Sequence, residues 1–358
     1  MLKRDEPLAI YMEGASLASI GKMGFGILRY SPNPVACVID SEHAGKDAGE
    51  LMGIPRTAPI VGTIDEAISR GAKCLVLGTA PSGGRIPAEW DCIIREAVNK
   101  GLSVVNGLHD LLAPRFPNLR PGQYIWDIRL EPKGIGVATG AARHLPNKRV
   151  LMIGTDMAIG KMTAGLELYR LIRERGVSVE FVATGQIGIT ITGQGVPLDA
   201  VRVDYACGAM EQAVLKASGG SDGNTLTEVV IVEGQGALCH PGSTANLPLL
   251  RGTMPTHLIL CHRAGQTHLQ KLSDIPIPPL SEYVRLYEDL ATVGGTFPRP
   301  KTIGIALNTN DLEEHEAICA MAKVERETGI MTCDPVRFGA DRFANTLTGY
   351  ECCMSHKR

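Results

Sequence analysis

The sequence has few aromatic residues and no long apolar segment. Phe, Trp and Tyr make up 4% of its 358 residues, and no apolar run approaches the ~20 residues that a membrane-spanning helix needs. The formal net charge is −2, with acidic and basic residues interspersed, which argues against a nucleic-acid or membrane surface. The first six residues lack the apolar core of a signal peptide. We therefore expect a cytoplasmic protein that acts on a small molecule, and we expect a homo-oligomer.

Ten cysteines are present, but their spacing is not that of a metal site or a disulfide framework. No Cys-x2-Cys pair occurs. The adjacent pairs Cys239-His240 and Cys261-His262 would place neighbouring side chains on opposite faces of a strand, where they chelate one ion poorly. The pattern indicates reduced, mostly buried thiols and no firm metal site.

Glycine is abundant, with 41 residues, and it punctuates an alternation of short apolar strands and helical patterns. This alternation predicts an α/β fold with parallel, doubly wound sheets. Proline and glycine residues near residue 145 predict a boundary between two domains, residues 1–145 and 146–358. A polar turn is expected at residues 218–224.

The second domain is organised around residues 149–175. An apolar strand leads into a loop bounded by Gly154 and Gly160, and Lys161 begins a helical pattern. In this arrangement, main-chain N–H groups and a helix N-terminus converge on a phosphate. The sequence therefore predicts a phosphate-binding loop.

This loop departs from the standard motif at the metal-binding position. A strict Gly-x4-Gly-Lys-Ser/Thr pattern would place its first glycine at Thr155, and here the glycine comes one residue earlier. Met162 follows Lys161, and Thr163 comes one residue too late. In the standard motif the lysine binds phosphate and the hydroxyl binds Mg²⁺. We expect phosphate binding without an obligatory metal, with Thr163 and Glu233 as the ligands if Mg²⁺ is bound.

Polar residues occur where several predicted strands of the second domain end. In a parallel sheet these ends lie at one edge, where α/β proteins bind ligands. Glu233 follows an apolar strand, as does the second metal or water contact of P-loop proteins. The residues expected together at this edge are Asp156, Gln186, Glu233, His240, Arg263 and Asn308.

The first domain carries weaker signals. Gly21-Lys22-Met23 echoes the phosphate loop, as a remnant of duplication, a second anion-binding helix start, or a turn that only opens a helix. Asp40 ends a strand where dinucleotide folds place a ribose-binding acid, but no Gly-x-Gly-x-x-Gly precedes it. Arg85, in a glycine-rich loop after a strand, is a candidate clamp for a substrate carboxylate.

Three motifs carry a resemblance to known proteins. Residues 154–161 and Val232-Glu233-Gly234 resemble the phosphate loop and the strand-end acid of dethiobiotin synthetase and its P-loop relatives. A closer similarity covers nearly the whole chain. Residues 154–163, 183–189 and 232–236, with His240-Pro241, are similar to the two-domain family of the D-glutamate N-acetyltransferase of D-glutamate metabolism. That resemblance implies a Rossmann-like domain followed by a P-loop NTPase-like domain, with Gly-Lys-Met-Thr as the family's own loop sequence.

The resemblance implies an enzyme that transfers acetyl from acetyl-CoA to the amine of an acidic amino acid, with D-glutamate expected. Acetylation needs a base for the ammonium group, for which we expect His240 or else Glu233, with Asp156 as a further catalytic residue. Arg263 and Arg85 would bind substrate carboxylates. The residues expected to hold the cofactor are Gly154, Thr155, Gly160, Lys161, Met162, Thr163, Gln186 and Asn308.

Two other functions stay open at this point. The first is a kinase or ligase that uses ATP with Mg²⁺ on a small carboxylate or amine, with Thr163 and Glu233 as metal ligands. The second is a non-catalytic nucleotide-binding protein, such as a sensor or an assembly factor.

Overall fold

The computed structural model describes residues 2–81, 83–219 and 226–349, so most of the turn expected at 218–224 lies outside the described residues. The chain divides into two compact units. The first comprises residues 1–131 and 185–200, and the second comprises residues 132–184 and 201–358. This division differs from the expected one in two places: it falls at residue 131 rather than near 145, and residues 185–200 return to the first unit.

The segment after residue 131 belongs to the second unit because helix α7 (Val203–Ser218) holds it. On this helix, Glu211 accepts hydrogen bonds of 2.9 Å from the main-chain N of Thr139 and of Ala141. Gly208 lies so close to Gly136 that an added Cβ would be 1.8 Å from its main-chain oxygen. Glu211 and Gly208 lie far along the chain from this segment, so the proline and glycine residues near the boundary could not indicate its position.

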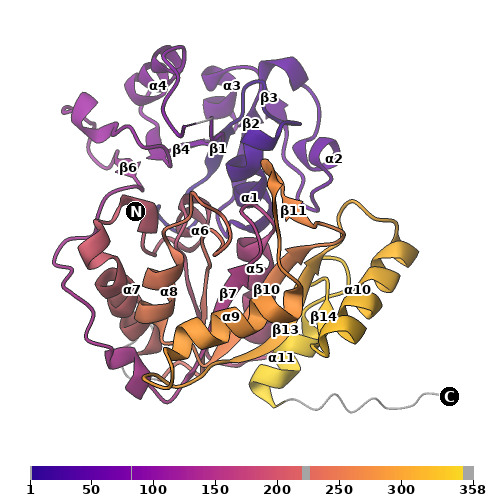
Figure 1. The fold of residues 1–358 in the computed structure, drawn as a ribbon. Coiled ribbons are helices and arrows are strands. Elements are labelled where there is room, and N and C mark those ends of the chain that lie inside the picture. The colour runs from indigo at the N-terminus through magenta and orange to yellow at the C-terminus, as the bar shows by residue number, and fades with distance from the viewer. Residues whose placement is uncertain (1, 82, 220–225, 350–358) are drawn as a thin grey trace. The chain divides into compact units, whose positions relative to one another are not determined.

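The first unit contains a six-stranded parallel sheet in the order β3-β2-β1-β4-β5-β6, coloured indigo to purple in Figure 1. This is the strand order of Rossmann dinucleotide-binding folds. Every residue of β1 and β4 is buried, as expected for central parallel strands covered on both faces. The strands are β1 (Leu8–Tyr11), β2 (Val35–Ile39), β3 (Ile60–Val61), β4 (Cys74–Leu77), β5 (Ser103–Asn106) and β6 (Ile125–Asp127). The α-helices described before residue 131 are α1 (Lys22–Tyr30), α2 (Ala48–Met52), α3 (Ile64–Ser69) and α4 (Trp90–Asn99).

The segment that returns to the first unit begins with helix α6 (Gln186–Thr192). This helix contacts α1 within the first unit, and Ile189 and Ile191 on it are buried. Its glycines mark its ends: Gly185 precedes it and Gly193, at φ +72°, ends it. Two of the glycines in this segment are therefore the caps of a short helix.

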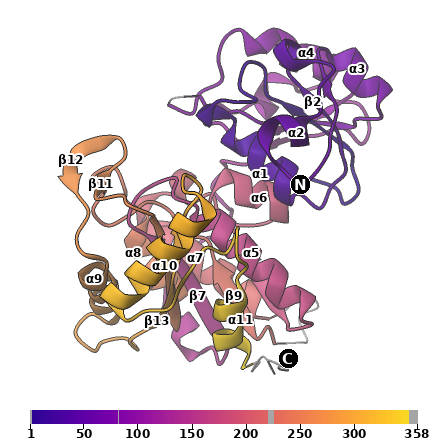
Figure 2. The ribbon, with the colours of Figure 1, turned by 90° about the vertical axis from the view of Figure 1, so that its right-hand side faces the viewer.

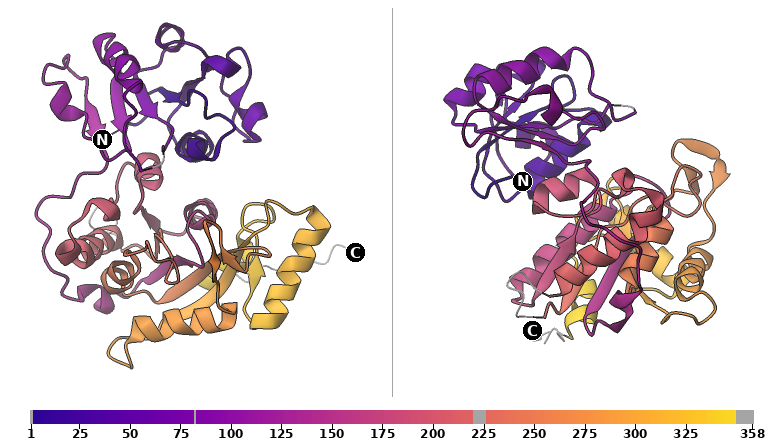
Figure 3. Two further views of the ribbon diagram at one scale, coloured as in Figure 1. Left: turned by 45° about the horizontal axis from the view of Figure 1, so that its top comes forward. Right: turned by 90° about the vertical axis from the view of Figure 1, so that its left-hand side faces the viewer.

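The second unit contains a six-stranded parallel sheet in the order β14-β13-β10-β7-β9-β8. Helices cover both faces of this sheet (Figures 2 and 3). Helices α5 and α11 pack against each other, and helices α7 and α8 pack against each other. Its strands are β7 (Lys148–Gly154), β8 (Val179–Val182), β9 (Val229–Val232), β10 (His257–Arg263), β13 (Lys301–Asn308) and β14 (Thr332–Cys333). Its other helices are α5 (Lys161–Glu174), α8 (Asn246–Thr253), α9 (Leu280–Thr292), α10 (Glu314–Thr328) and α11 (Asp341–Thr348).

The central strands of this sheet end at the same edge with staggered ends: β7 extends three residues past the end of β9, and β10 extends two residues past the end of β7. Gly154, the last residue of β7, pairs with Cys261 in β10, and Leu151 pairs with Val232, the last residue of β9. An antiparallel hairpin, β11 (His268–Leu269) and β12 (Leu272–Pro276), follows β10. The phosphate loop, the segment after β9 and this hairpin thus all leave the sheet at its carboxyl edge.

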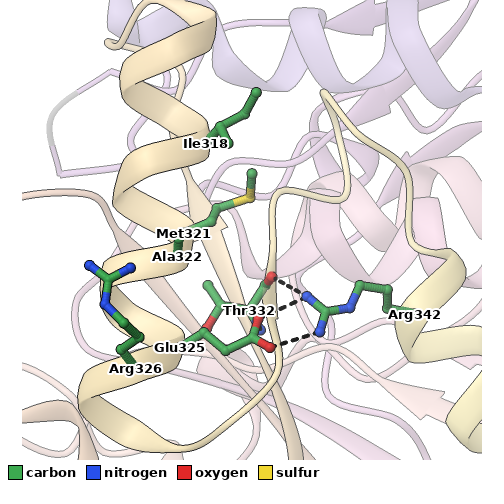
Figure 4. A pocket seen from close by; sticks show the side chains of 7 residues that line it. All are labelled: Ile318, Met321, Ala322, Glu325, Arg326, Thr332 and Arg342. Carbon is green, nitrogen blue, oxygen red and sulfur yellow. Dashed lines mark hydrogen bonds and ion pairs between the residues drawn. The ribbon is translucent and has the colours of Figure 1, made fainter.

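An ion pair protects one edge of this sheet, at strand β14 (Figure 4). Edge strand β14 leaves one side of Thr332 without a neighbouring strand, but its main-chain N donates to Glu325 at 3.0 Å and its main-chain O accepts from Arg342 at 3.1 Å. Glu325 and Arg342 also bond each other through both pairs of atoms, at 2.8 Å. The pair occupies the place where another strand would add, so the sheet ends here.

No helix within the described residues combines the length and the apolar character that crossing a membrane requires.

Candidate active site at the carboxyl ends of the second sheet

The loop between β7 and α5 surrounds the side chain of Lys161. This residue begins α5, is 7% exposed, and donates a 2.7 Å hydrogen bond from Nζ to the main-chain O of Asp156. Two glycines flank its side chain: an added Cβ would lie 3.0 Å from Lys161 Cδ at Gly154 and 3.3 Å from it at Gly234. Residues without side chains therefore keep open the narrow space that the lysine occupies.

The Lys161 ammonium group is buried without a carboxylate partner among the described residues; its hydrogen bond goes to a main-chain carbonyl. Burial lowers its pKa, against the opposing influence of Cys261, Asp156 and Glu233. The first turn of α5 carries no acidic residue, and Gly160, at φ +103°, offers no side-chain cap. Uncapped N–H groups at a helix start beside a buried cation make an anion-binding site. A phosphate group fits this set of donors.

Asp156 joins the phosphate loop to the β11–β12 hairpin. Its Oδ2 accepts hydrogen bonds from Gln266 Nε2 at 2.7 Å and from the main-chain N of Gln270 at 2.8 Å. Its Oδ1 accepts one from the main-chain N of Met157 at 2.6 Å. Both carboxylate oxygens are thus engaged in holding local structure, which favours positioning over proton transfer.

A buried pair supports the loop from the neighbouring strand. Thr155 Oγ1 lies 2.8 Å from Nδ1 of His262, near the end of β10, and both residues are buried. Burial lowers the pKa of His262 to about 4, so its imidazole is neutral at physiological pH. A neutral ring fixes Thr155 without adding a second positive charge near Lys161.

Two further residues bond the main chain at the end of β7. Tyr283 on α9 donates from its hydroxyl to the main-chain O of Gly154 at 3.2 Å, and Cys239 Sγ donates to that of Thr155 at 3.2 Å. The same thiol lies 3.5 Å from the Tyr283 hydroxyl. Sequence reasoning missed Tyr283 and gave Cys239 and His262 no role, because no spacing signal links residues that meet only through strand pairing.

Glu233 links the ends of β8 and β9. Its Oε2 accepts a 2.8 Å hydrogen bond from the main-chain N of Thr184, and its main-chain O accepts one of 2.9 Å from the Thr184 hydroxyl. Gln235 Nε2 lies 3.4 Å from its other carboxylate oxygen. The residue is buried. Gly234 follows it with no room for a side chain, since a Cβ would lie 1.6 Å from the main-chain O of Met152.

His240 lies in the turn after β9, where its Nδ1 accepts a 3.1 Å hydrogen bond from the main-chain N of Gly242. A neutral ring that accepts through Nδ1 carries its proton on Nε2. The imidazole can therefore take a substrate proton only after it gives up this hydrogen bond or changes tautomer.

Arg263 and Asn308 end the neighbouring strands β10 and β13, where they form a cross-strand pair. Asn308 Nδ2 donates to the main-chain O of Ile159 in the phosphate loop at 3.3 Å. Arg263 Nη1 pairs with Asp311 at 2.6 Å, while its buried Nε has no hydrogen-bond partner in the structure described. An unpaired guanidinium donor at this edge suits a substrate carboxylate.

The remaining predicted residues divide between the two units. Met162 and Thr163 lie in the first turn of α5 and are half-buried. Gln186 and Arg85 belong to the first unit, where Arg85 is exposed and pairs with Asp110 at 3.2 Å. The carboxyl edge of the second sheet thus carries Asp156, Glu233, His240, Arg263 and Asn308 with the loop, whereas Gln186 is the first residue of α6 and is assigned to the first unit.

Carboxylate, thiol and imidazole groups close enough to share a metal occur once in the part of the chain that the structure describes. They are Asp40, Glu42 and His43 in the first unit. Asp40 already accepts hydrogen bonds from the main-chain N of Glu42 at 3.3 Å and from His43 Nδ1 at 3.0 Å, so it serves as the cap of a turn. Within the described residues the phosphate loop shows no such cluster, and its donors suit phosphate better than a metal.

Comparison with known proteins gives matches along most of the chain. Residues 41–131 match a domain of unknown function described as the DUF1611_N Rossmann-like domain, and residues 136–344 match the DUF1611_C P-loop domain. The chain is similar to a D-glutamate N-acetyltransferase of Tritonibacter scottomollicae, with 33% identity over 349 residues, 96% of this chain and 98% of that protein. It is also similar to a D-glutamate N-acetyltransferase of a Pseudoalteromonas species, with 35% identity over 293 residues, 80% of this chain and 84% of that protein.

A solved structure has the same fold along nearly the whole chain. The crystal structure of a DUF1611 family protein from Anabaena variabilis ATCC 29413 matches with a TM-score of 0.91 and 47% identity. The match covers 96% of this chain and 100% of that one.

Proposed function

Since this chain belongs to the DUF1611 family, with a Rossmann-like domain followed by a P-loop domain, we propose that it is an N-acetyltransferase. It transfers acetyl from acetyl-CoA to the amine of an acidic amino acid, with D-glutamate as the first candidate. The names of the two curated relatives support the reaction class. The chemistry of the phosphate loop supports the cofactor.

The observation that carries the proposal is the buried Lys161 ammonium at the uncapped start of α5. Coenzyme A carries a pyrophosphate and a 3′-phosphate that stay unchanged during acetyl transfer, so the site has only to bind them. A cation without a carboxylate partner, together with helix N–H groups, suffices for binding. Asn308 holds the loop in place through Ile159, and Asp156 holds the hairpin beside it.

We assign the general base to Glu233, with His240 second. A buried carboxylate can bind the substrate ammonium and accept its proton as the amine attacks the thioester carbonyl. The Nδ1 lone pair of His240 is already used by Gly242. Arg263, with its unpaired Nε, is the candidate partner of a substrate carboxylate.

Two substitutions separate the candidate bases. Glu233→Gln keeps an oxygen for the Thr184 N–H, and kcat should fall by about 10²–10⁴-fold because the base is lost. In His240→Asn the side-chain oxygen can still accept from Gly242, so kcat should stay within about threefold. If His240→Asn is the variant that loses activity, His240 replaces Glu233 as the base.

The activity test measures free thiol released from acetyl-CoA with D- and L-glutamate, D- and L-aspartate and simple amines. We expect release with D-glutamate above the other acceptors. Binding of acetyl-CoA without thiol release on any acceptor would contradict the proposal and favour a non-catalytic binding protein.

A second candidate is a kinase or ligase that uses ATP with Mg²⁺. Glu233 favours it, because a buried acid follows the strand next to β7, where P-loop enzymes hold metal or water. Thermal unfolding with acetyl-CoA and with ATP and Mg²⁺ separates the two. Stabilisation by ATP that EDTA abolishes would replace the acetyltransferase proposal.

We further propose a cytoplasmic homo-oligomer. The eight cysteines in the described ranges are all free thiols, which suits a reducing compartment. Light scattering on the purified protein measures the oligomeric state, and a monomer at all concentrations would refute that part.

A further inference from the structure

A cavity of about 110 Å³ lies in the second unit at the amino end of β7. A water molecule occupies roughly 30 Å³ of liquid, so the space holds about four waters or one small ion. The seven-residue strand β7 separates it from the phosphate loop by roughly 20 Å. It is therefore a separate site.

Arg149 of β7 lines this cavity and is 3% exposed. Its Nε and Nη1 make five hydrogen bonds, all to carbonyl oxygens, between 2.9 and 3.2 Å. No carboxylate partner occurs among the described residues, and Nη2 makes none of these bonds. Two of the oxygens, of Thr253 and Met254, lie at the C-terminus of α8. The helix dipole there offsets only about half of a unit charge.

Two further arginines line the cavity. Arg143 is exposed, donates from Nη1 to the main-chain O of Thr139 at 3.2 Å and of Gly140 at 2.8 Å, and has no acidic partner in the described chain. Arg299 pairs with Glu288 and with Asp289. The three guanidinium groups are therefore balanced by only two carboxylates, which leaves a net positive charge at the cavity.

Buried charge is unfavourable unless it is paired. Burial without an acid also lowers the pKa of Arg149 to about 10. The other walls include the apolar residues Met254, Phe297 and Pro298. The hydroxyl of Thr256, which also lines the cavity, already donates to the main-chain O of Arg149 at 3.2 Å, so the guanidinium groups are the side-chain donors left for a ligand. The volume excludes a nucleotide or coenzyme A.

We propose that this cavity binds one small oxyanion, held by Arg143 and by Nη2 of Arg149. The ligand class is a phosphate, a sulfate or a short carboxylate, because guanidinium groups bind the paired oxygens of such ions. The exposed Arg143 gives it access from solvent. The bound ion neutralises the charge at the start of the strand that leads to the phosphate loop.

The test compares thermal unfolding in inorganic phosphate, sulfate and acetate, each titrated against sodium chloride at constant ionic strength. The proteins are wild type, Arg143→Gln and Arg326→Gln; Arg326 is an exposed arginine on α10 outside the cavity. We expect saturable stabilisation of wild type by at least one ion, and an apparent Kd at least about tenfold higher for Arg143→Gln. Arg326→Gln should behave as wild type.

Anion binding at the phosphate loop is common to the three proteins and cancels in the comparison. Arg143 is exposed, so its loss should leave the chloride-only Tm unchanged. Equal responses of wild type and Arg143→Gln would overturn the proposal, as would a response that rises linearly in all three proteins or no response to any of the ions.

Discussion

Replacing Lys161 by methionine tests the central physical claim about the phosphate loop. Methionine has a similar length and no charge, so it fills the slot between Gly154 and Gly234 without an ammonium group. A charge-assisted hydrogen bond to phosphate contributes about 1.5–3 kcal/mol, which corresponds to a Kd for acetyl-CoA raised by about 10- to 150-fold. The stability of the unliganded protein should not fall with the affinity. Removing a buried cation without a carboxylate partner relieves a desolvation cost, so the free energy of unfolding should stay equal or rise by about 1 kcal/mol.

The assay is calorimetric titration of acetyl-CoA together with urea unfolding of the unliganded protein. Lys323→Met on α10 is the matched control, because Lys323 is exposed and pairs only with Glu327 at 3.8 Å. An unchanged Kd for Lys161→Met would remove the loop from the proposed function. A stability loss of several kcal/mol would show instead that the ammonium group is needed for folding.

Three further predictions follow from the same contacts. Unfolded histidine takes up a proton below pH 6.5, whereas folded His262 does so only near pH 4, so stability should fall as the pH drops through this window. Urea unfolding at pH 7 and pH 5 should show wild type losing about 2 kcal/mol more than His262→Asn; an equal loss would refute the assignment. Gly234→Ala should lower Tm strongly, since its Cβ would lie 1.6 Å from a main-chain oxygen. Gly154→Ala, whose Cβ would meet the side chains of Ile159 and Lys161, should weaken acetyl-CoA binding with a smaller change in Tm. A fragment of residues 1–131 should unfold at a lower temperature than the same fragment with residues 185–200 joined through a flexible linker, because α6 packs on α1; equal Tm values would contradict that packing role.

The α/β fold and the position of the phosphate loop could be predicted because their signals are local. A strand, a glycine-bounded loop and a lysine at the first helical position lie within one short segment, and β7, the loop and α5 follow that pattern. The residues of the candidate site, by contrast, are far apart in the sequence. Which strand ends meet depends on the order β10-β7-β9, and a sequence gives the order of strands along the chain but not across a sheet.

Residues 185–200 show where local reasoning fails. The strand end at Thr184 bonds Glu233 in the second unit, yet the next residues belong to the first unit. Gln186, predicted at the edge of the second sheet, is the first residue of α6, which contacts α1 in the first unit. Ile189 and Ile191 are both buried but lie two positions apart, so they do not share one helical face, and the local pattern does not indicate that α6 contacts α1.

The displaced hydroxyl of the loop also bears on the reaction. In phosphoryl transfer, charge changes on the phosphate itself, so Mg²⁺ and a hydroxyl ligand beside the lysine take part in catalysis. In acetyl transfer the phosphates of the cofactor do not react and lie far from the thioester. It is therefore sufficient that the protein binds them equally well in the ground state and in the transition state. Met162 stands where the metal-binding hydroxyl would be, while Lys161 and the uncapped helix start keep the means to bind phosphate. The loop has kept what cofactor binding needs and lacks what phosphoryl transfer needs, which favours acetyl-CoA over ATP as its ligand.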